Sequence, residues 1–410
     1  MYEKYLNMKV YLVGGAVRDF LLKIPVIERD WVVIGSTPKE MLQKGYRQVG
    51  KGFPVFLHPD NNEEYALARI ERKSGIGHTG FFCSFSRNVS LEEDLVRRDL
   101  TINAIACDKY GHFIDPCNGI RDIFLRKLRH ISNAFCEDPL RVLRVARFAA
   151  RFFHLGFSVD PDTLLLMKSM KSELTCLSSE RIWKETEQAL MTNNPHIFFQ
   201  ILYDCGVLNV LFPELYSLFN VSCFMNKCEK VNFGVYTLNL ISIVSKLSDD
   251  ISVRFSSICY HFGKSISYFS VFPGCYNIKL GTKVIEVFCK RLKIPVYLKK
   301  LAKISERCNS LLHISRYLTS QEIIYFFNSI NVWNHPNILD KLIMLYESDM
   351  KVRYGVENCV YFKGQFLKEA YKISSVITAR EMMKEGFVGK DISDVLNCRR
   401  INLLNKWRNI

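Results

Sequence analysis

The stretch that most constrains the fold is residues 10–30, VYLVGGAVRDFLLKIPVIERD. Its first part, Val10–Val13, is an apolar run typical of a buried strand, and the pair Gly14 and Gly15 is typical of a tight turn. The next residues, Ala16–Lys23, have the composition and apolar spacing of a helix. The stretch therefore predicts a strand, a turn and a helix that follow one another directly.

Such a turn is suited to binding an anion. Glycines between a strand and a helix let backbone N–H groups come close to the anion, and the helix N-terminus adds a favourable partial charge. Arg18 lies in the first helical turn and can reach the same anion with its planar donor fork. Gly15 and Arg18 are therefore candidate phosphate-binding residues.

Two acidic residues follow this cradle. Glu28 and Asp30 lead into the apolar strand Trp31–Ile34, and residues two apart on a strand point to the same face. Two neighbouring carboxylates beside a phosphate site are what Mg²⁺-assisted phosphoryl or nucleotidyl transfer needs. The alternative is a structural turn followed by a solvated acidic strand end, and this motif alone leaves it open.

The GGAVRD motif and the carboxylate-x-Asp strand resemble the superfamily of class II tRNA nucleotidyltransferases and bacterial poly(A) polymerases. The first half of the chain resembles bacterial CCA-adding enzymes in particular. The resemblance implies an α+β fold, with a nucleotidyltransferase α/β head built on a mixed sheet and an all-helical neck, body and tail. The implied domains are the head at 8–136, the neck at 137–215, the body at 216–325 and the tail at 326–410.

Composition narrows the class of protein. A net charge of +15 over 410 residues suits a polyanionic partner, and no apolar run is long enough to cross a bilayer. Fourteen cysteines without a CxxC pair favour reduced, mostly buried thiols in a cytoplasmic protein. The residues before Met8 match neither a signal peptide nor a clear transit peptide, and the start at Met1 or Met8 stays open. Monomer and homodimer also stay open.

Local patterns place further elements. Helices are expected after Gly15, Thr37 and Asp99, the last two with capping residues, and almost only helices are expected from Glu137 onward. The expected strands are Val10–Val13, Asp30–Ile34, Val55–Leu57, Glu64–Ile70, Phe113–Ile114 and Leu128–His130.

Glu64 matches the position of a third acidic residue in the relatives, where it could help hold metals or deprotonate the attacking hydroxyl. An exposed strand acid is an equally good interpretation, and neighbouring Glu63 leaves the register open. The polar, glycine-rich segment 71–80 is expected to be a mobile loop. In the relatives, a loop at this point helps the site accommodate ATP after CTP.

A second basic motif is RRD at Arg97, Arg98 and Asp99. Asp99 can cap a helix that starts at Leu100, and one of two adjacent arginines usually points to solvent, which we expect of Arg97. The resemblance assigns Arg98 to nucleotide binding.

The most specific motif is EDPLRVLRVARF at residues 137–148, where Pro139 suits the first turn of a helix and Asp138 suits its cap. Three arginines then share one helical face: Arg141, Arg144 and Arg147. Because the face has no interspersed acids, like charges would repel and a polyanionic partner is the favoured explanation. The resemblance assigns Arg144 and Arg147 to nucleotide binding.

The pair Asp138 and Arg141 suits the choice of a base. Cytosine and adenine both carry an exocyclic amine beside an unprotonated ring nitrogen, so a carboxylate can accept from the amine while a guanidinium donates to the ring. Uracil and guanine present a carbonyl where that amine should be. The resemblance assigns this template-free selection of C and A to the pair.

The C-terminal half departs from the family. Related bacterial enzymes often carry a metal-dependent phosphohydrolase site built on a His-Asp dipeptide, but Tyr260 and His261 stand at that dipeptide and Tyr236 stands at an upstream histidine. The downstream glycine- and histidine-rich segment is reduced to Pro273–Asn277. Without clustered His and Asp ligands, phosphohydrolase activity is predicted to be absent.

The resemblance implies addition of CCA to tRNA 3′ ends from CTP and ATP, with two Mg²⁺ held by Glu28 and Asp30. Relatives usually have aspartate at the position of Glu28, and the extra methylene displaces the carboxylate oxygens by about an ångström. The nearest alternative is a bacterial poly(A) polymerase, but residues 49–54 carry one basic residue and resemble the CCA-adding version. A CC-only or A-only enzyme and a non-catalytic tRNA-binding relative are further alternatives.

Overall fold

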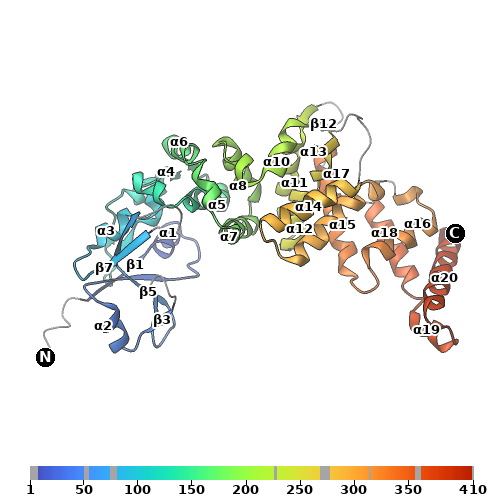
Figure 1. The fold of residues 1–410 in the computed structure, drawn as a ribbon, viewed down its shortest axis with the longest axis horizontal. Helices are drawn as coiled ribbons and strands as arrows, with labels where there is room; N and C mark the ends of the chain where they lie inside the picture. The colour runs from blue at the N-terminus through green and yellow to red at the C-terminus, as the bar shows by residue number, and fades with distance from the viewer. Residues whose placement is uncertain are drawn as a thin grey trace. The chain divides into compact units, whose positions relative to one another are not determined.

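The chain divides into two compact units in the computed structural model, which describes residues 8–49, 55–73, 81–225, 229–267, 278–313, 315–355 and 362–408. Unit 1 comprises 1–189 and 197–211, and unit 2 comprises 190–196 and 212–410 (Figure 1). The predictions for residues 1–7, 50–54, 74–80 and 273–277 concern residues outside the described part. Boundaries between head and neck and between body and tail stay predictions.

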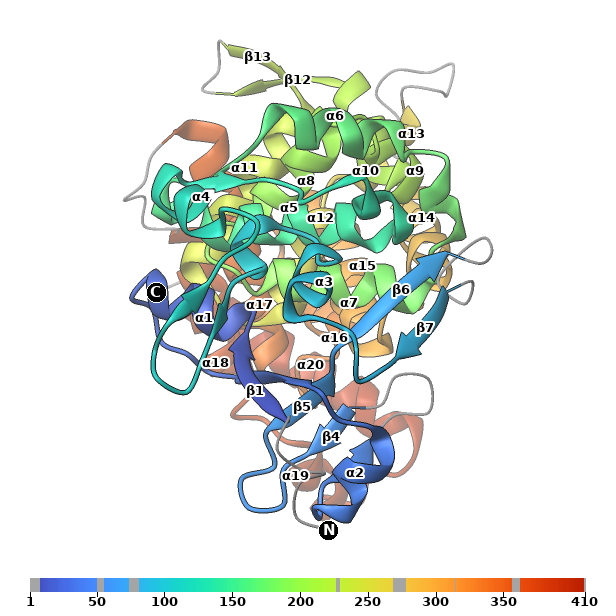
Figure 2. The ribbon, with the colours of Figure 1, turned by 90° about the vertical axis from the view of Figure 1, so that its left-hand side faces the viewer.

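A mixed sheet forms the centre of unit 1, as predicted. It has seven strands among the described residues, in the order β3-β4-β5-β2-β1-β8-β9. Figure 2 shows β4, β5 and β1 of this sheet. β2 runs parallel to β5, and all other neighbours are antiparallel. The strands are β1 Lys9–Val13, β2 Asp30–Ile34, β3 Arg47–Val49, β4 Val55–Leu57, β5 Glu64–Leu67, β8 Ala106–Cys107 and β9 Phe113–Ile114.

The predicted strand Glu64–Ile70 was too long, because the chain changes partner after Ala68. The Ala68 amide still donates to the Val33 carbonyl, but the Arg69 amide donates to the carboxylate of Asp94. The chain then continues as β6, which pairs only with β7 among the described strands. The strands outside the main sheet are β6 Arg69–Lys73, β7 Phe81–Phe85, β10 Lys127–Leu128, β11 Ser158–Val159, β12 Ser222–Met225 and β13 Glu229–Asn232.

The helices of unit 1 begin largely where local chemistry predicts. Thr37 caps α2 in a capping box with Glu40, and Pro38 occupies the first turn. Asp99 does not cap a helix at Leu100, because only the short 3-10 helix η2 follows, and Leu100 precedes it without a side-chain cap. The helices are α1 Gly15–Leu21, α2 Pro38–Gln43, α3 Leu91–Val96, α4 Gly119–Leu125, α5 Leu140–Phe152, α6 Pro161–Ser169, α7 Ser179–Leu190, α8 Pro195–Asp204 and α9 Leu208–Leu211, with 3-10 helices η2 Thr101–Asn103, η3 Asn133–Glu137, η4 Phe153–Leu155 and η5 Glu173–Cys176.

Alternate residues of β2 supply the two faces of the sheet. Val32 joins a buried cluster with Val13 and Leu95, whereas Val33 packs with Met41 and Phe56 on the opposite face. This period of two is what the apolar strand sequence predicts. Because both faces are packed, the register of β2 is fixed, and with it the position of Asp30 at its first residue.

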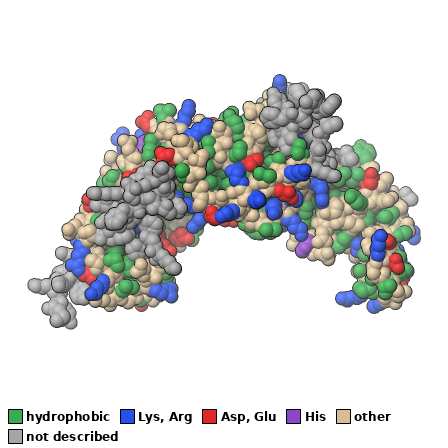
Figure 3. Space-filling model, in the orientation of Figure 1, with side chains coloured by type: hydrophobic (Ala, Val, Ile, Leu, Met, Phe, Trp, Pro, Cys, Tyr) green, Lys and Arg blue, Asp and Glu red, His purple; other side chains and the backbone are tan. Residues whose placement is uncertain are grey.

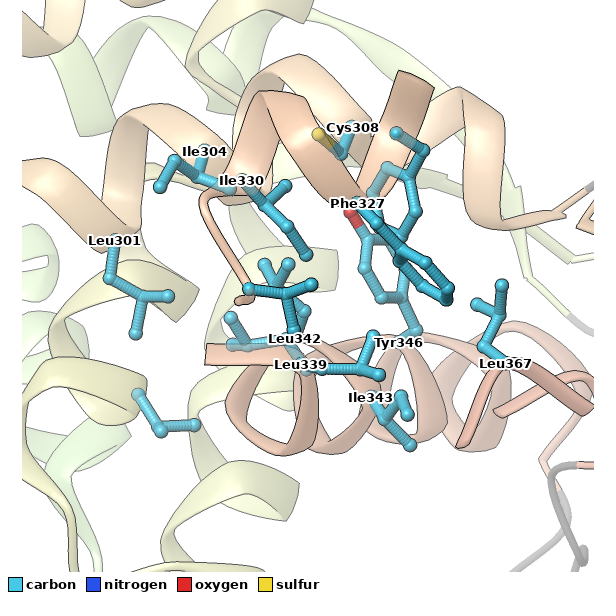
Figure 4. Packing of buried hydrophobic residues seen from close by; sticks show 14 of the residues in the cluster. Leu301, Ile304, Cys308, Phe327, Ile330, Leu339, Leu342, Ile343, Tyr346 and Leu367 are labelled. Atoms are coloured by element: carbon cyan, nitrogen blue, oxygen red, sulfur yellow. The ribbon is translucent and has the colours of Figure 1, made fainter. Parts of the chain in front are cut away.

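Unit 2 is helical apart from the short pair β12 and β13 among the described residues. Its core is organised on α17, where Leu339, Leu342, Ile343 and Tyr346 recur at helical spacing and face α15 (Figure 4). The helices are α10 Pro213–Ser217, α11 Phe233–Leu247, α12 Ile251–Cys259, α13 Phe262–Ser267, α14 Ile278–Arg291, α15 Val296–His313, α16 Ser320–Ile330, α17 Asn337–Tyr354, α18 Phe362–Ser374, α19 Ala379–Lys384 and α20 Lys390–Arg408, with η6 Leu218–Asn220 and η7 Ser315–Tyr317.

No helix in the described ranges has the length and apolar character needed to cross a membrane. The positive charge is distributed over the surface. On the face drawn in Figure 3, the coloured Lys and Arg side chains lie among Asp and Glu side chains.

Candidate active site

The turn between β1 and α1 is shaped by Gly14. Its φ of +67° is a left-handed conformation that glycine adopts easily, and an added Cβ would lie 2.9 Å from the Nη1 atom of Arg98. Gly15 instead would place a Cβ 3.5 Å from the nearest protein atom, on Arg18, which is ordinary contact. The absence of a side chain at Gly14 therefore leaves room for the guanidinium of Arg98, while Gly15 is the first residue of α1.

The acidic residues gather at the start of β2. Asp30 pairs with Glu64 across the parallel strands, and Trp31 donates to Glu63 at 2.7 Å, so Glu64 is the acid in register with Asp30. The Asp30 side chain is exposed overall, but nearby protein atoms desolvate its carboxylate and Glu28 repels it, which raises its pKa. Arg98 lies near enough to oppose that rise.

These carboxylates suit a hydrated divalent ion. Among the described residues, no three His, Cys, Asp or Glu side chains converge enough to hold a metal by themselves. Glu28 and Asp30 are nevertheless exposed and close enough to interact. Mg²⁺ is commonly held by one or two carboxylates with waters and substrate phosphates completing its shell, so this donor set fits Mg²⁺.

The sequence predicts that Arg18 can reach an anion at the turn; in this structure its guanidinium is buried among protein groups. Its side chain is 3% exposed, donates to Asn103 at 2.5 Å and forms an ion pair with Asp19 at 2.6 Å. The guanidinium also lies over the ring of Phe152 on α5, 4.8 Å from its centroid. Burial lowers the pKa of Arg18 to about 10. In this conformation Arg18 joins α1 to η2 and α5.

Arg97 does not point to solvent either. Both Arg97 and Arg98 pair with the buried carboxylate of Asp94, at 2.6 and 3.1 Å. Burial alone would raise the pKa of Asp94, but the two guanidinium groups lower it. The Nε atom of Arg98 is buried and makes no hydrogen bond with the described residues, so Arg98 keeps a donor for a further acceptor.

The arginines of α5 are paired through tertiary contacts. Arg144 donates to Asp99 at 2.7 Å, Arg147 donates to Glu185 at 2.6 Å, and Arg151 reaches Asp19 at 2.9 Å. The argument that this face needs a polyanion because it lacks acids was therefore wrong, because other elements supply the acids.

Asp99 is buried and accepts from two side chains, those of Arg144 and Asn103. Burial would raise its pKa, yet Arg144 and a hydrogen bond from Asn103 lower it. In return, Asp99 raises the pKa of Arg144. Asp99 was predicted to cap a helix, but it instead forms an ion pair with Arg144 of α5 and accepts from Asn103 of η2.

Arg141 and Asp138 are held from different sides. Arg141 is 7% exposed and donates to the backbone carbonyls of Arg97 at 2.6 Å and Ala134 at 2.8 Å. Asp138 accepts from the amide of Leu140 with one oxygen and from Arg181 with the other, at 3.0 and 2.7 Å. The two base-selecting candidates are not paired with each other here.

Arg181 is the residue that sequence reasoning missed. It is the third residue of α7, in a segment that was interpreted only as a packed neck helix. Arg181 and Asp138 are 43 positions apart, so no local spacing indicates their contact.

In unit 2, residues at the positions of the phosphohydrolase site of relatives form a buried polar cluster around Asp349. Tyr236 donates its hydroxyl to Asp349 at 2.7 Å, Arg353 lies 3.3 Å from the same carboxylate, and a nitrogen of His261 lies 3.8 Å from it. Asp349 is fully buried. The neighbours of the Asp349 carboxylate therefore include the phenol of Tyr236 and the guanidinium of Arg353.

The fold and these side chains define the class of protein. Residues 10–129 match the family described as "Poly A polymerase head domain", and residues 156–218 match that described as "Probable RNA and SrmB- binding site of polymerase A". The chain therefore carries the head of a nucleotidyltransferase.

The family follows from similarity over the whole chain. The sequence is 48% identical over 405 residues to the CCA-adding enzyme of Blochmanniella pennsylvanica (strain BPEN), a match that covers 98% of this chain and 99% of that protein. The chain belongs to the family of CCA-adding enzymes.

Solved structures agree on the fold. The Bacillus stearothermophilus CCA-adding enzyme in complex with CTP aligns with a TM-score of 0.65 and 20% identity, covering 99% of this chain and 94% of that chain. The Thermotoga maritima enzyme complexed with tRNA aligns with a TM-score of 0.62 and 18% identity, covering 97% and 87%. The mixed-sheet head followed by a largely helical remainder is thus the fold of this family.

Proposed function

We propose that this protein adds C, C and A to the 3′ ends of tRNA from CTP and ATP, without a nucleic-acid template. Membership of the CCA-adding family supports the reaction. The observation that carries the proposal is that Arg141, in the same motif as Asp138, is held against the head through the backbone carbonyl of Arg97. A carboxylate and a guanidinium that both reach the base would complement the shared edge of cytosine and adenine.

Rigidity is what makes this pair selective. Arg141 is anchored by backbone carbonyls of two separate segments, so it cannot turn to accommodate another base without breaking those bonds. Asp138 accepts from an exocyclic amine and is repelled by the carbonyl of uracil or guanine. An unpaired buried polar group costs about 1–3 kcal/mol, enough to reject the wrong base.

The head supplies the reacting centre. Glu28 and Asp30 would hold Mg²⁺, which lowers the barrier by stabilising charge on the phosphates. Gly15 in the turn and Arg98 after α3 would bind the triphosphate, and Glu64, in register with Asp30, would assist from the neighbouring strand. Arg18, Arg144 and Arg147 would also bind the nucleotide, and their partners on other elements hold the three guanidinium groups in place.

The RNA partner is tRNA. The chain carries a net charge of +15, which favours a polyanion whose backbone is held by charge and shape. Monomeric and homodimeric forms both accommodate this function, and the proposed setting is the cytoplasm.

Phosphohydrolase activity is not proposed for unit 2. The cluster around Asp349 presents a phenol, an imidazole and a guanidinium, and the guanidinium of Arg353 would repel a divalent cation. Tyr236 stays a phenol at neutral pH, because burial and Asp349 raise its pKa.

A 3′-end extension assay tests the function. The protein is incubated with Mg²⁺, CTP, ATP and a tRNA that ends at the discriminator base, and the product ends are sequenced. Addition of C-C-A and nothing further is the expected result. A long A tail would instead identify a poly(A) polymerase, and addition that stops after C-C would identify a CC-adding enzyme.

The variant Glu28→Asp tests whether glutamate, in place of the aspartate usual in relatives, impairs the metal site. If wild type adds nothing but Glu28→Asp adds CCA, the nucleotide-binding assignments hold, and the glutamate at position 28 prevents the metal site from working. Failure of both proteins to add nucleotides, while both still bind tRNA, would make the chain a non-catalytic tRNA-binding relative.

A further inference from the structure

Exposed aromatic side chains lie on neighbouring elements of the head. Phe20 of α1 and Phe113 of β9 are 63% and 39% exposed, and their ring centroids lie 6.3 Å apart. The helix α4 contacts α1 and carries Phe124, which is 84% exposed, with the exposed Ile120 one helical turn before it. Single exposed apolar side chains are ordinary, but a group supplied by three elements indicates an interaction surface. We call these four residues the aromatic patch.

The aromatic patch is separate from the residues that are proposed to bind the nucleotide. Arg18 of α1 is buried and contacts Asn103 and the ring of Phe152. Phe20 lies two positions further along the same helix, and two positions correspond to a rotation of about 200° around the helix axis. The patch therefore lies on the side of α1 that faces away from Arg18, and binding of CTP or ATP does not explain it.

The surroundings of the aromatic patch are basic. Its three elements contain or adjoin four exposed cations, which are Lys23, Lys109, Arg121 and Arg126. Among the described residues, none of these cations forms an ion pair with an acid. The nearby carboxylates of Asp108 and Asp115 instead accept hydrogen bonds from backbone amides of their own loops. The positive charge around the rings is therefore left for an anionic partner.

Aromatic rings surrounded by cations fit single-stranded RNA. Its phosphates pair with Lys and Arg, and its unpaired bases stack on exposed rings. Double-stranded RNA keeps its bases stacked inside the helix, so it could not use the rings. A symmetric contact with a second copy of this chain would bring the same cations face to face, and such a contact is opposed by like-charge repulsion.

We propose that the aromatic patch binds a single-stranded segment of RNA. The bases stack on Phe20, Phe113 and Phe124, and the surrounding cations hold the phosphates. The site extends the function beyond the addition of CCA, because it uses a different side of α1 and requires neither CTP nor Mg²⁺. It recognises unpaired RNA rather than a base sequence, since every base has a π-face.

The test measures binding of fluorescein-labelled oligo(U) RNA of about ten nucleotides, a length typical of a single-stranded binding site. Uridine is chosen because the proposed nucleotide pocket rejects uracil, and CTP and Mg²⁺ are left out. The variants are Phe20→Ser, Phe124→Ser, Phe124→Leu and Phe124→Tyr. The matched control is Phe362→Ser on α18, whose side chain is 64% exposed. Addition of one CMP to tRNA shows that each variant is folded and active.

Loss of one stacked base corresponds to about a five- to hundredfold change in affinity. We expect Phe20→Ser and Phe124→Ser each to raise the Kd for oligo(U) by that factor while CMP addition is unchanged. Phe124→Tyr retains a ring and should bind as wild type does, whereas Phe124→Leu retains only apolar area and should bind as weakly as Phe124→Ser. Phe362→Ser should behave as wild type.

The electrostatic part of the proposal has its own measurement. Arg121→Met should weaken binding and lower the slope of log Kd against log salt concentration by about 0.7, the value for one phosphate contact with a single strand. An unchanged slope would remove Arg121 from the site.

Four results would overturn the proposal. Wild type does not bind oligo(U), the serine variants bind it as wild type does, or Phe362→Ser loses as much affinity as they do. The fourth result is equal binding by Phe124→Leu and wild type, because an apolar contact would then replace stacking. If the serine variants lower the dimer content in analytical ultracentrifugation while oligo(U) binding is unchanged, the patch is a contact between copies of the chain. Should a serine variant lose CMP addition, the comparison of Phe124→Tyr with Phe124→Leu still decides.

Discussion

The turn between β1 and α1 offers a prediction that separates backbone strain from function. Gly14 and Gly45 both have positive φ, +67° and +85°, and an alanine at either position loses about 1–2 kcal/mol of folding free energy through the left-handed conformation. At Gly45 nothing lies within 4 Å of the added Cβ. At Gly14 the Cβ would lie 2.9 Å from Arg98, which must then move.

The consequence for Gly14→Ala is a selective loss of activity. The displaced end of Arg98 is bound to Asp94 at 3.1 Å and lies near Asp30, so its movement would weaken the phosphate contact that we propose for Arg98. Such a contact corresponds to about 1.5–3 kcal/mol, or roughly ten- to hundredfold in kcat/KM for CTP. Gly45→Ala should lose similar stability and keep its activity.

Gly15→Ala completes the comparison. Its Cβ makes only ordinary contact with the protein, at 3.5 Å, so stability should be unchanged or slightly higher. Any loss of kcat/KM in this variant then measures how closely the triphosphate approaches the turn. The assays are denaturant unfolding and single-nucleotide addition. Equal activity of Gly14→Ala and Gly45→Ala would refute the reasoning about Arg98.

Three further predictions concern the metal site and the buried ion pairs. Glu28→Gln should abolish Mg²⁺-dependent addition, while Glu28→Asp should retain it, as titration of addition rate against Mg²⁺ will establish; equal rates for the two variants would contradict the assignment. Arg144→Met leaves Asp99 buried and unpaired and should cost about 2 kcal/mol, less than a fully buried pair because Arg144 is 37% exposed. The pKa of Asp99 in the folded protein lies below its usual value of about 4, so wild type should lose this stability only as the pH falls below that value. The free energy of unfolding should therefore depend less steeply on pH in this acid range in Arg144→Met than in wild type. Burial raises the pKa of Glu306 to about 7, so the native state holds a proton that the unfolded state has lost between about pH 4.5 and 7. The thermal stability of wild type should include a component that falls as the pH rises through that window, and this component should be missing in Glu306→Gln; identical pH profiles would contradict it.

Much of the architecture was determined by short-range sequence patterns. Alternation along β2 placed Val32 and Val33 on opposite faces, and Thr37 with Glu40 specified the start of α2. These features depend on residues at most four positions apart, where covalent geometry limits the possible contacts. The positions of Gly14 and Asp30 at the ends of their strands follow from the same patterns.

The partners of the site residues were decided by tertiary structure. Arg144 meets Asp99 at a separation of 45 positions, Arg147 meets Glu185 at 38, and Arg181 meets Asp138 at 43. Sequence alone presented Arg144 and Arg147 as cations available to a polyanion and assigned no role to Arg181. Which distant acid reaches a given guanidinium depends on how whole helices pack, because a side chain extends only a few ångströms and spacing along the chain carries no information about such pairs.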